Sequence, residues 1–198
     1  MSWTDSGARR RPYHVGNLRT QLLDEARALL EAGGRSELNL RALAARAGIA
    51  AGSVYHHYAS KAALMAGLAA MGFRELEASL KDAASHAPDA TPIRTSALAY
   101  FAFARSQPAL YELMFDAGLM SDPEVASARD SAFAVLESVI VQSPSQQGVE
   151  PDVIHKVALA VWACGHGAAS LTLAEGGTAG SSLMEDVIQG LETLFRRR

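Results

Sequence analysis

Residues 47–64 read AGIAAGSVYHHYASKAAL, and the four consecutive ring side chains at the centre of this stretch need an explanation. They follow a glycine and a run of small residues, and Ser-Lys follows them. Consecutive residues of a helix lie about 100° apart, so the four rings cannot all face one hydrophobic core. Some of these polar rings must therefore point outward, where a partner can reach them.

The residues around this stretch predict two short helices joined by a tight turn. Asn39 can cap the first helix, Gly48 can end it, and the second helix spans about 51–57. Val54 falls on the inner face of the second helix. This pattern has the form of a helix-turn-helix, in which the second helix enters the DNA major groove with its N-terminal residues toward the bases.

Several residues of this motif could contact DNA. Ala51 and Gly52 would let the helix backbone come close, and Lys61 lies in the first turn of the next helix, where backbone N–H groups favour a phosphate. Phenol and imidazole groups can bond phosphates without a full charge. Tyr58 has two interpretations, a core residue or part of this polar surface. The outward-facing candidates on the second helix are Ser53, Tyr55, His56 and His57.

The charge distribution favours an anionic partner for the N-terminal part. The chain has a formal net charge of −3, but residues 1–61 hold nine Lys and Arg against five Asp and Glu, a net of +4. The rest has a net charge of −7. Such an asymmetry suggests that the head meets an anion and the body does not. Chance variation in surface charge would give the same count.

Composition narrows the function classes. The single cysteine, Cys164, rules out an internal disulfide and a cysteine-based zinc site. His56 and His57 diverge on a helix and have no third ligand in register, so we expect no metal. No uninterrupted run of about 18 apolar residues and no secretory signal is present, so we expect a cytoplasmic protein without a membrane span.

The rest of the chain also alternates predicted helices with breaks, and shows no convincing strand, repeat or P-loop. Residues 18–30 form an apolar stripe that Gly33-Gly34 ends, 143–151 read as a loop, and EGGTAGSS at 175–182 reads as a flexible joint. The predicted helices of the body span 61 to before 88, 91–105, 108–115, 123 to near 144, about 152–173 and 182–198.

Residues 40–64, LRALAARAGIAAGSVYHHYASKAAL, resemble the DNA-binding signature of the tetracycline-repressor (TetR) family of transcriptional regulators, and PYHVGNLRTQLLDEARALLEAGG upstream resembles the family's first helix. The resemblance implies an all-α protein, with a three-helix DNA-binding head over 1–61 and a ligand-binding, dimerising body of about six helices over 62–198. The contacts it implies with DNA are Arg41, Ala51, Gly52, Ser53, Tyr55, His56, His57 and Lys61. Many family members carry a longer polar residue at position 51 and phenylalanine at 58.

Two further features each concern a candidate binding group. Arg9, Arg10 and Arg11 could lie in the minor groove as a flexible arm or form a solubilising tail. In the body, residues 162–167 resemble a TetR C-terminal domain type named for its Trp-His-Gly motif. His166 could anchor a ligand or be a core histidine bonded to a backbone carbonyl.

The body supplies aromatic and apolar residues for a ligand cavity, because such sites are mostly apolar with few polar anchors. Small residues on 152–172, with the last helix over 182–196, predict a homodimer interface built from four helices. We expect a regulator, most simply a repressor, that binds a near-palindromic operator as a homodimer, is released by a largely apolar inducer and needs no cofactor. An enzyme using His166 and Tyr111, or an interaction module, are the alternatives. The candidate ligand contacts are Tyr100, Phe103, Tyr111, Phe115, Trp162 and His166.

Overall fold

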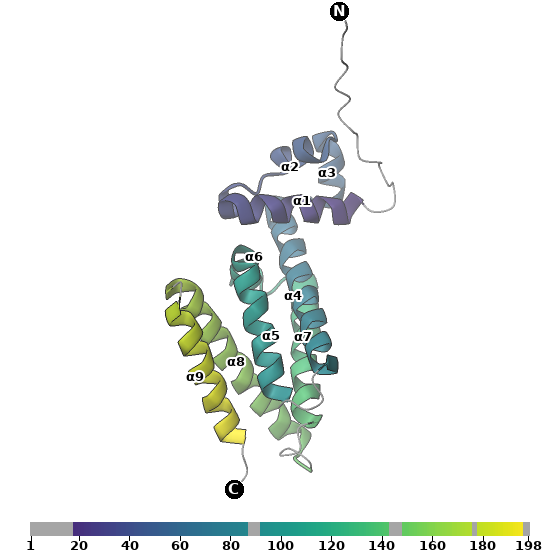
Figure 1. Ribbon diagram of the computed structural model, residues 1–198. Coiled ribbons are helices and arrows are strands. Elements are labelled where there is room, and N and C mark those ends of the chain that lie inside the picture. The colour runs from purple at the N-terminus through teal and green to yellow at the C-terminus, as the bar shows by residue number, and fades with distance from the viewer. Residues whose placement is uncertain (1–17, 87–91, 143–147, 176–177, 196–198) are drawn as a thin grey trace, which may run out of the picture.

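The computed structural model describes residues 18–86, 92–142, 148–175 and 178–195, and all regular secondary structure within these ranges is helical, as predicted. Figure 1 shows α1 to α3 as a head on one end of an elongated body, with α4 running from the head into the body. The helices are α1 Leu18–Gly33, η1 Gly34–Ser36, α2 Leu40–Ala47, α3 Ala51–His57, α4 Lys61–His86, α5 Pro92–Ser106, α6 Pro108–Met114, α7 Pro123–Gln142, α8 Pro151–Glu175 and α9 Thr178–Phe195.

The predicted boundaries of the helix-turn-helix are confirmed. The Asn39 side chain accepts hydrogen bonds from the backbone N–H groups of Arg41 and Ala42 at the start of α2. Gly48 ends α2 with φ 68° and ψ 30°, a left-handed conformation that strains any residue with a Cβ. Val54 is fully buried, so one face of α3 packs on the head and the opposite face is left exposed.

Prolines begin four helices of the body, α5, α6, α7 and α8. A proline is tolerated in a first turn because the N–H that it lacks would have no partner within the helix. The sequence therefore predicts these four starts to within one residue. The start of α9 was predicted wrongly. It begins at Thr178 rather than at 182, because Thr, Ala and Ser are compatible with a first helical turn.

Close packing of α4 ties the head to the body. A Cβ on Gly67 would lie 3.0 Å from the Tyr58 ring, and one on Gly72 would lie 2.6 Å from the Met114 sulfur on α6. Tyr58 is thereby a core residue with 2% exposure. Because α4 is continuous from Lys61 to His86, the boundary after residue 61 remains a prediction.

By length and composition alone, α8 is apolar enough to cross a membrane over Pro151–Ala174. In its apolar window, 22% of the residues are buried inside the chain. One such helix is weak evidence for a membrane span, since core helices of soluble proteins have the same composition. Here α8 packs against α5, α7 and α9. Figure 1 shows α8 and α9 together along one side of the body.

Candidate DNA-binding interface and ligand site

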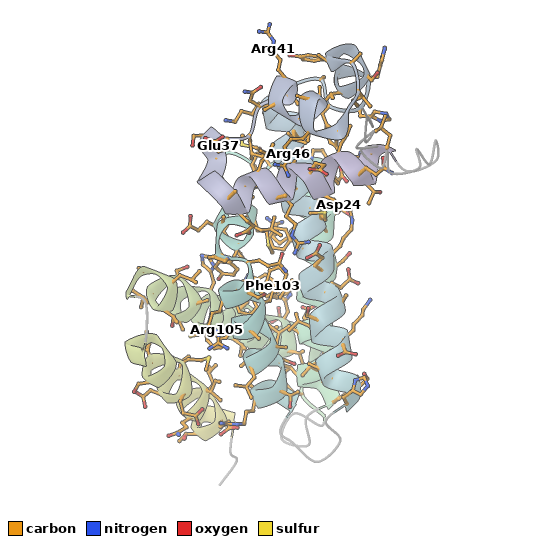
Figure 2. All side chains as sticks on the ribbon, turned by 45° about the horizontal axis from the view of Figure 1, so that its top comes forward. Asp24, Glu37, Arg41, Arg46, Phe103 and Arg105 are labelled. Carbon is orange, nitrogen blue, oxygen red and sulfur yellow. The ribbon has the colours of Figure 1, made fainter. Side chains whose placement is uncertain are left out.

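The residues predicted to contact DNA lie on the outer surface of the head. Ser53 is partly buried and the other seven are exposed. Tyr55 has half of its surface exposed, whereas Val54 and Tyr58 fill the core beneath α3. Figure 2 shows Arg41 pointing away from the body at the far end of the head. The exposed face of α3 thus carries rings and small residues but no carboxylate.

Most of the positively charged side chains in the described part of the head form ion pairs with carboxylates. Within the described residues 18–61, four of six Lys and Arg side chains pair with carboxylates. Arg41 and Lys61 make no such pair in this part of the chain, and the Lys61 Nζ donates to the Arg35 carbonyl at 2.6 Å. These two uncompensated charges are both residues that the motif predicted for DNA. The pairs are Arg19–Glu124, Arg27–Glu75, Arg35–Asp116 and Arg46–Glu25.

The predicted arm, Arg9 to Arg11, lies outside the described residues. Metal binding by the head gains no support, since no group of three or more His, Cys, Asp or Glu side chains that could hold a metal occurs within the described ranges.

Helix α6 connects the head to the interior of the body. The Glu31 carboxylate on α1 accepts a hydrogen bond from the Leu110 N–H at 3.1 Å. Arg35 pairs with Asp116 just after α6 and also donates to the Glu112 carbonyl at 3.2 Å. The guanidinium of Arg35 holds the pKa of the Asp116 carboxyl below its usual value. Both ends of α6 are thus bonded to the head.

Residues of α6 and α8 line a pocket of the body that is partly open to solvent, which we call the His166 cavity. Its volume is about 290 Å³. Glu112 is the only charged residue among its lining residues, which otherwise present aromatic rings, an imidazole, a hydroxyl and aliphatic groups. The lining residues are Tyr111, Glu112, Phe115, His166, Ser170, Leu173 and Ala174.

A chain of hydrogen bonds runs into the wall of this cavity. The Tyr100 and Tyr111 hydroxyls are 3.0 Å apart, and the Tyr111 hydroxyl is 2.8 Å from the His166 Nδ1. Burial raises the pKa of Tyr111 to about 12 and lowers the pKa of His166 below its ordinary value. Phe115 lies against the imidazole, with ring centroids 4.0 Å apart. His166 is therefore fixed in orientation and neutral near pH 7.

A second, smaller hollow lies on the other side of these rings. It has a volume of about 30 Å³, enough for a water molecule, and an apolar wall that includes Tyr100 and Trp162. Ser96 also lines it, and its buried hydroxyl has no hydrogen-bond partner in the described structure. We call this hollow the Ser96 cavity.

The structure divides the predicted ligand residues into three groups. Tyr111, Phe115 and His166 line the His166 cavity, and Tyr100 and Trp162 line the Ser96 cavity. Phe103 is buried in the core and lines neither cavity. The carbonyl-bonded core histidine considered for His166 is not observed, because its Nδ1 bonds Tyr111.

Sequence reasoning missed three polar residues of these cavities. Ser96 lies four residues before Tyr100, Ser170 lies four residues after His166, and Glu112 adjoins Tyr111. Residues four apart share a helix face, so the two serines had a detectable signal. Nothing in the sequence distinguishes Glu112 from other surface carboxylates.

Helix α8 leaves an apolar stripe uncovered. Leu159, Ala163, Gly167 and Leu171 recur every four residues, and all four are exposed. The other small residues predicted for the dimer interface point inward, because Ala158, Ala168 and Ala169 pack in the core of their own chain. The same correction applies on α9 to Val187, which lines the Ser96 cavity, and to buried Leu191.

This geometry defines a class of protein, a helix-turn-helix head mounted on a helical body that contains a pocket. Comparison with known families identifies it further. Residues 22–68 match the bacterial regulatory proteins of the tetR family, and residues 93–195 match the tetracyclin repressor-like C-terminal domain. The chain belongs to the TetR family and is a DNA-binding transcriptional regulator, which agrees with the expectation that it is not an enzyme.

Solved structures share this fold over nearly the whole chain. A protein of unknown function from Rhodococcus sp. RHA1 is 29% identical, with a TM-score of 0.75, covering 93% of this chain and 96% of its own. The regulator PfmR from Thermus thermophilus is 18% identical with a TM-score of 0.63, covering 86% and 96%. FadR from Bacillus subtilis, solved in complex with stearoyl-CoA, is 12% identical with a TM-score of 0.65, covering 87% and 96%. No curated protein matches the sequence.

Proposed function

We propose that this regulator is a ligand-responsive repressor that binds a near-palindromic operator as a homodimer and leaves it when a small molecule occupies the body. The observation that carries this proposal is the position of α6. Tyr111 and Glu112 of this helix line the His166 cavity, while the Leu110 N–H and the Glu112 backbone carbonyl bond to the head. A molecule that moves α6 would therefore also move the head.

The head is suited to gripping a duplex through phosphates and reading it through α3. Arg41 and Lys61 would neutralise phosphates, because their charges are not compensated by nearby carboxylates in the described structure. Ala51 and Gly52 would permit a close approach, and a Cβ added to Gly52 would meet nothing within 4 Å in the free protein. Tyr55, His56 and His57 would supply hydrogen bonds to phosphates or base edges.

Response to a ligand requires two states of the body with different affinities for it. Arg35 and Glu31 would transmit the difference, because they bond to opposite ends of α6 from the head. In the DNA-binding state the two heads would present their α3 helices about 34–36 Å apart, one turn of the duplex, or a multiple of that spacing. A ligand would favour a spacing that does not fit.

The apolar stripe of α8 supports a dimer with a second copy of this chain. Leu159 and Leu171 are each 54% exposed, and the small residues between them allow a close approach of two helices. The interface would lie along 152–172, joined by the exposed side of α9 within 182–196. Burying this stripe would also remove exposed apolar surface of α8 from water.

Two finer assignments rest on resemblance. We infer that the C-terminal domain is of the Trp-His-Gly type, because Trp162 and His166-Gly167 stand in that order on α8. We also infer a cytoplasmic location, since an operator-binding protein must reach DNA.

Selection of duplexes from a random DNA pool tests the proposal. Purified protein should enrich a near-palindromic site, bound by two chains, with an affinity that falls steeply as salt rises. Enrichment of a site without a repeated half-site, or binding by one chain per duplex, would contradict the dimeric repressor. A screen for molecules that release the enriched DNA would then test the response to ligand.

A further inference from the structure

We infer that the His166 cavity takes an uncharged aromatic ligand that places a hydrogen-bond acceptor, such as a ketone or amide carbonyl, on the Nε2–H group of His166. The inference rests on the proposed ligand-responsive function and specifies the chemistry of its ligand. Three independent features of the cavity lead to it. They are the direction of the hydrogen-bond chain, the charge of the lining residues and the rings of the wall.

The direction of the chain follows from Tyr100. Its hydroxyl is buried, and Tyr111 is its hydrogen-bond partner within the described residues. A buried hydroxyl proton without an acceptor is costly, so Tyr100 donates to the Tyr111 oxygen. The Tyr111 hydroxyl has a second partner at hydrogen-bond distance, the His166 Nδ1. The proton of Tyr111 is then left for that second partner.

The tautomer of His166 follows from Tyr111. Because the Tyr111 oxygen accepts from Tyr100, its own proton points to the His166 Nδ1, 2.8 Å away. A neutral imidazole that accepts at Nδ1 carries its proton at Nε2. Burial, which lowers the pKa of His166, keeps the ring neutral. The Nε2–H group has no partner within the described residues and is free to donate to a molecule in the cavity.

The charge of the lining residues excludes an anionic ligand. Neither Lys nor Arg lines the His166 cavity, and the Glu112 carboxylate does. An anion would lose hydration without meeting a cation and would be repelled by Glu112. The acceptor is therefore neutral. This separates the His166 cavity from a site for a fatty acid carboxylate.

The rings of the wall favour a flat aromatic body for the ligand. Phe115 lies 5.0 Å from Tyr111 and 4.0 Å from His166 between ring centroids, so three rings form one side of the cavity. Aromatic pairs at such separations are favourable in offset and edge-to-face geometries. A volume of about 290 Å³ suits a two-ring compound.

Three naphthalenes of nearly equal size test this chemistry by calorimetric titration of the protein without DNA. They are 2-acetylnaphthalene with a neutral acceptor, 2-naphthoate with an anionic acceptor and 2-ethylnaphthalene with none. We expect 2-acetylnaphthalene to bind at least about tenfold more tightly than the other two, the strength of one ordinary hydrogen bond. Preference for naphthoate, equal affinities, or no binding by any of the three would overturn the inference.

Two substitutions test whether His166 is the donor responsible for the preference for the ketone. His166→Leu removes the donor and should abolish the preference for the ketone, whereas His166→Gln keeps an amide donor and should retain part of it. His86→Gln on the exposed end of α4 is the matched control and should change nothing. An unchanged preference in His166→Leu would place the ligand elsewhere and overturn the inference.

A measurement without any ligand tests the same chain of bonds. Nitrogen-15 NMR of the imidazoles, assigned by comparison with His166→Gln, should show His166 as the Nε2–H tautomer at pH 7.5. The Nδ1–H tautomer would overturn the inference even if His166→Leu fails to fold. Neither this test nor the titrations involve DNA. If the ketone binds as expected but does not release the operator, the proposed repressor function fails and the assignment of the cavity stands.

Discussion

The head and the body of this regulator leave different kinds of surface uncovered. The head exposes α3 with its polar rings and the charges of Arg41 and Lys61, whereas the body exposes an apolar stripe on α8 that contains Leu159 and Leu171. A polar, cationic surface keeps its hydration until a polyanion replaces the counterions, whereas an apolar stripe is stabilised by any contact that excludes water. The two surfaces therefore suit two different partners, DNA for the head and a second copy of the chain for the body.

The sharpest contrast lies within α3 and its C-terminal cap, where two tyrosines have opposite roles. Tyr58→Ala should lower the free energy of unfolding by about 3–5 kcal/mol, because it empties a fully packed site against Gly67. Tyr55→Ala should lower it by less than about 1 kcal/mol, since half of that side chain is exposed. Urea denaturation measures both values, and equal losses would contradict the assignment of the two faces.

The next largest effect is expected on dimerisation, when the apolar stripe of α8 is disrupted. Leu159→Asp combined with Leu171→Asp should raise the dimer dissociation constant by at least about a hundredfold, since each carboxylate would lose its hydration without a partner. Light scattering after size exclusion should then report monomer. Val141→Asp is the matched control, because Val141 is 53% exposed but lies on α7. If the Val141→Asp control also loses the dimer, the effect is not specific to α8, and the assignment of α8 to the interface is contradicted.

The cations of the head should separate into two classes. Arg41→Ala and Lys61→Ala should each weaken binding to the selected operator about tenfold and reduce the salt slope by about 0.9, the effect of one lost phosphate contact. Arg46→Ala should have a smaller effect, because Glu25 already pairs with Arg46 at 3.0 Å. Fluorescence anisotropy across a salt series gives both quantities. An equal effect in all three variants would show that pairing within the head does not select the DNA contacts.

The smallest effect concerns pH and the interior of the body. The pKa of His166 is lowered in the folded state from its ordinary value of 6.5, so below that pH the unfolded chain binds more protons than the folded one. Stability should therefore fall as the pH decreases from 6.5 through the folded pKa, by at most about 1.4 kcal/mol per pH unit. The difference between the wild-type and His166→Gln profiles isolates this contribution. A flat difference between pH 7 and 5 would contradict the partly buried, neutral imidazole.

The sequence predicts the head better than the body because the signals of the head are local. Asn39, Gly48 and Val54 act within one or two helical turns, and each behaves as predicted. The role of Tyr58 could not be settled in this way, since it depends on Gly67 in another helix. The net charge of the head was visible in the sequence. The ion pairs of its arginines were not visible in the sequence, because Arg19 and Arg35 pair with carboxylates that lie 105 and 81 residues away along the chain.

In the body, prolines fix the helix starts but no local signal fixes the cavities. Tyr111 and His166 were singled out as types of residue that suit a ligand site, yet their bond spans 55 residues and two helices. Ser96 is a further example, since the packing of α5 against α4, α7, α8 and α9 makes it a buried hydroxyl without a partner in the described structure. Which side of α8 faces outward was also beyond the sequence, because small residues occur on both sides.

Sedimentation velocity of the regulator with its selected operator, across a salt series from about 50 to 500 mM, tests the central contrast most directly. We expect two chains per duplex at low salt, and a free dimer that persists after salt has released the DNA, because only the head depends on counterion release. A complex containing one chain, or a dimer that dissociates together with the DNA, would contradict the assignment of the two surfaces to two partners.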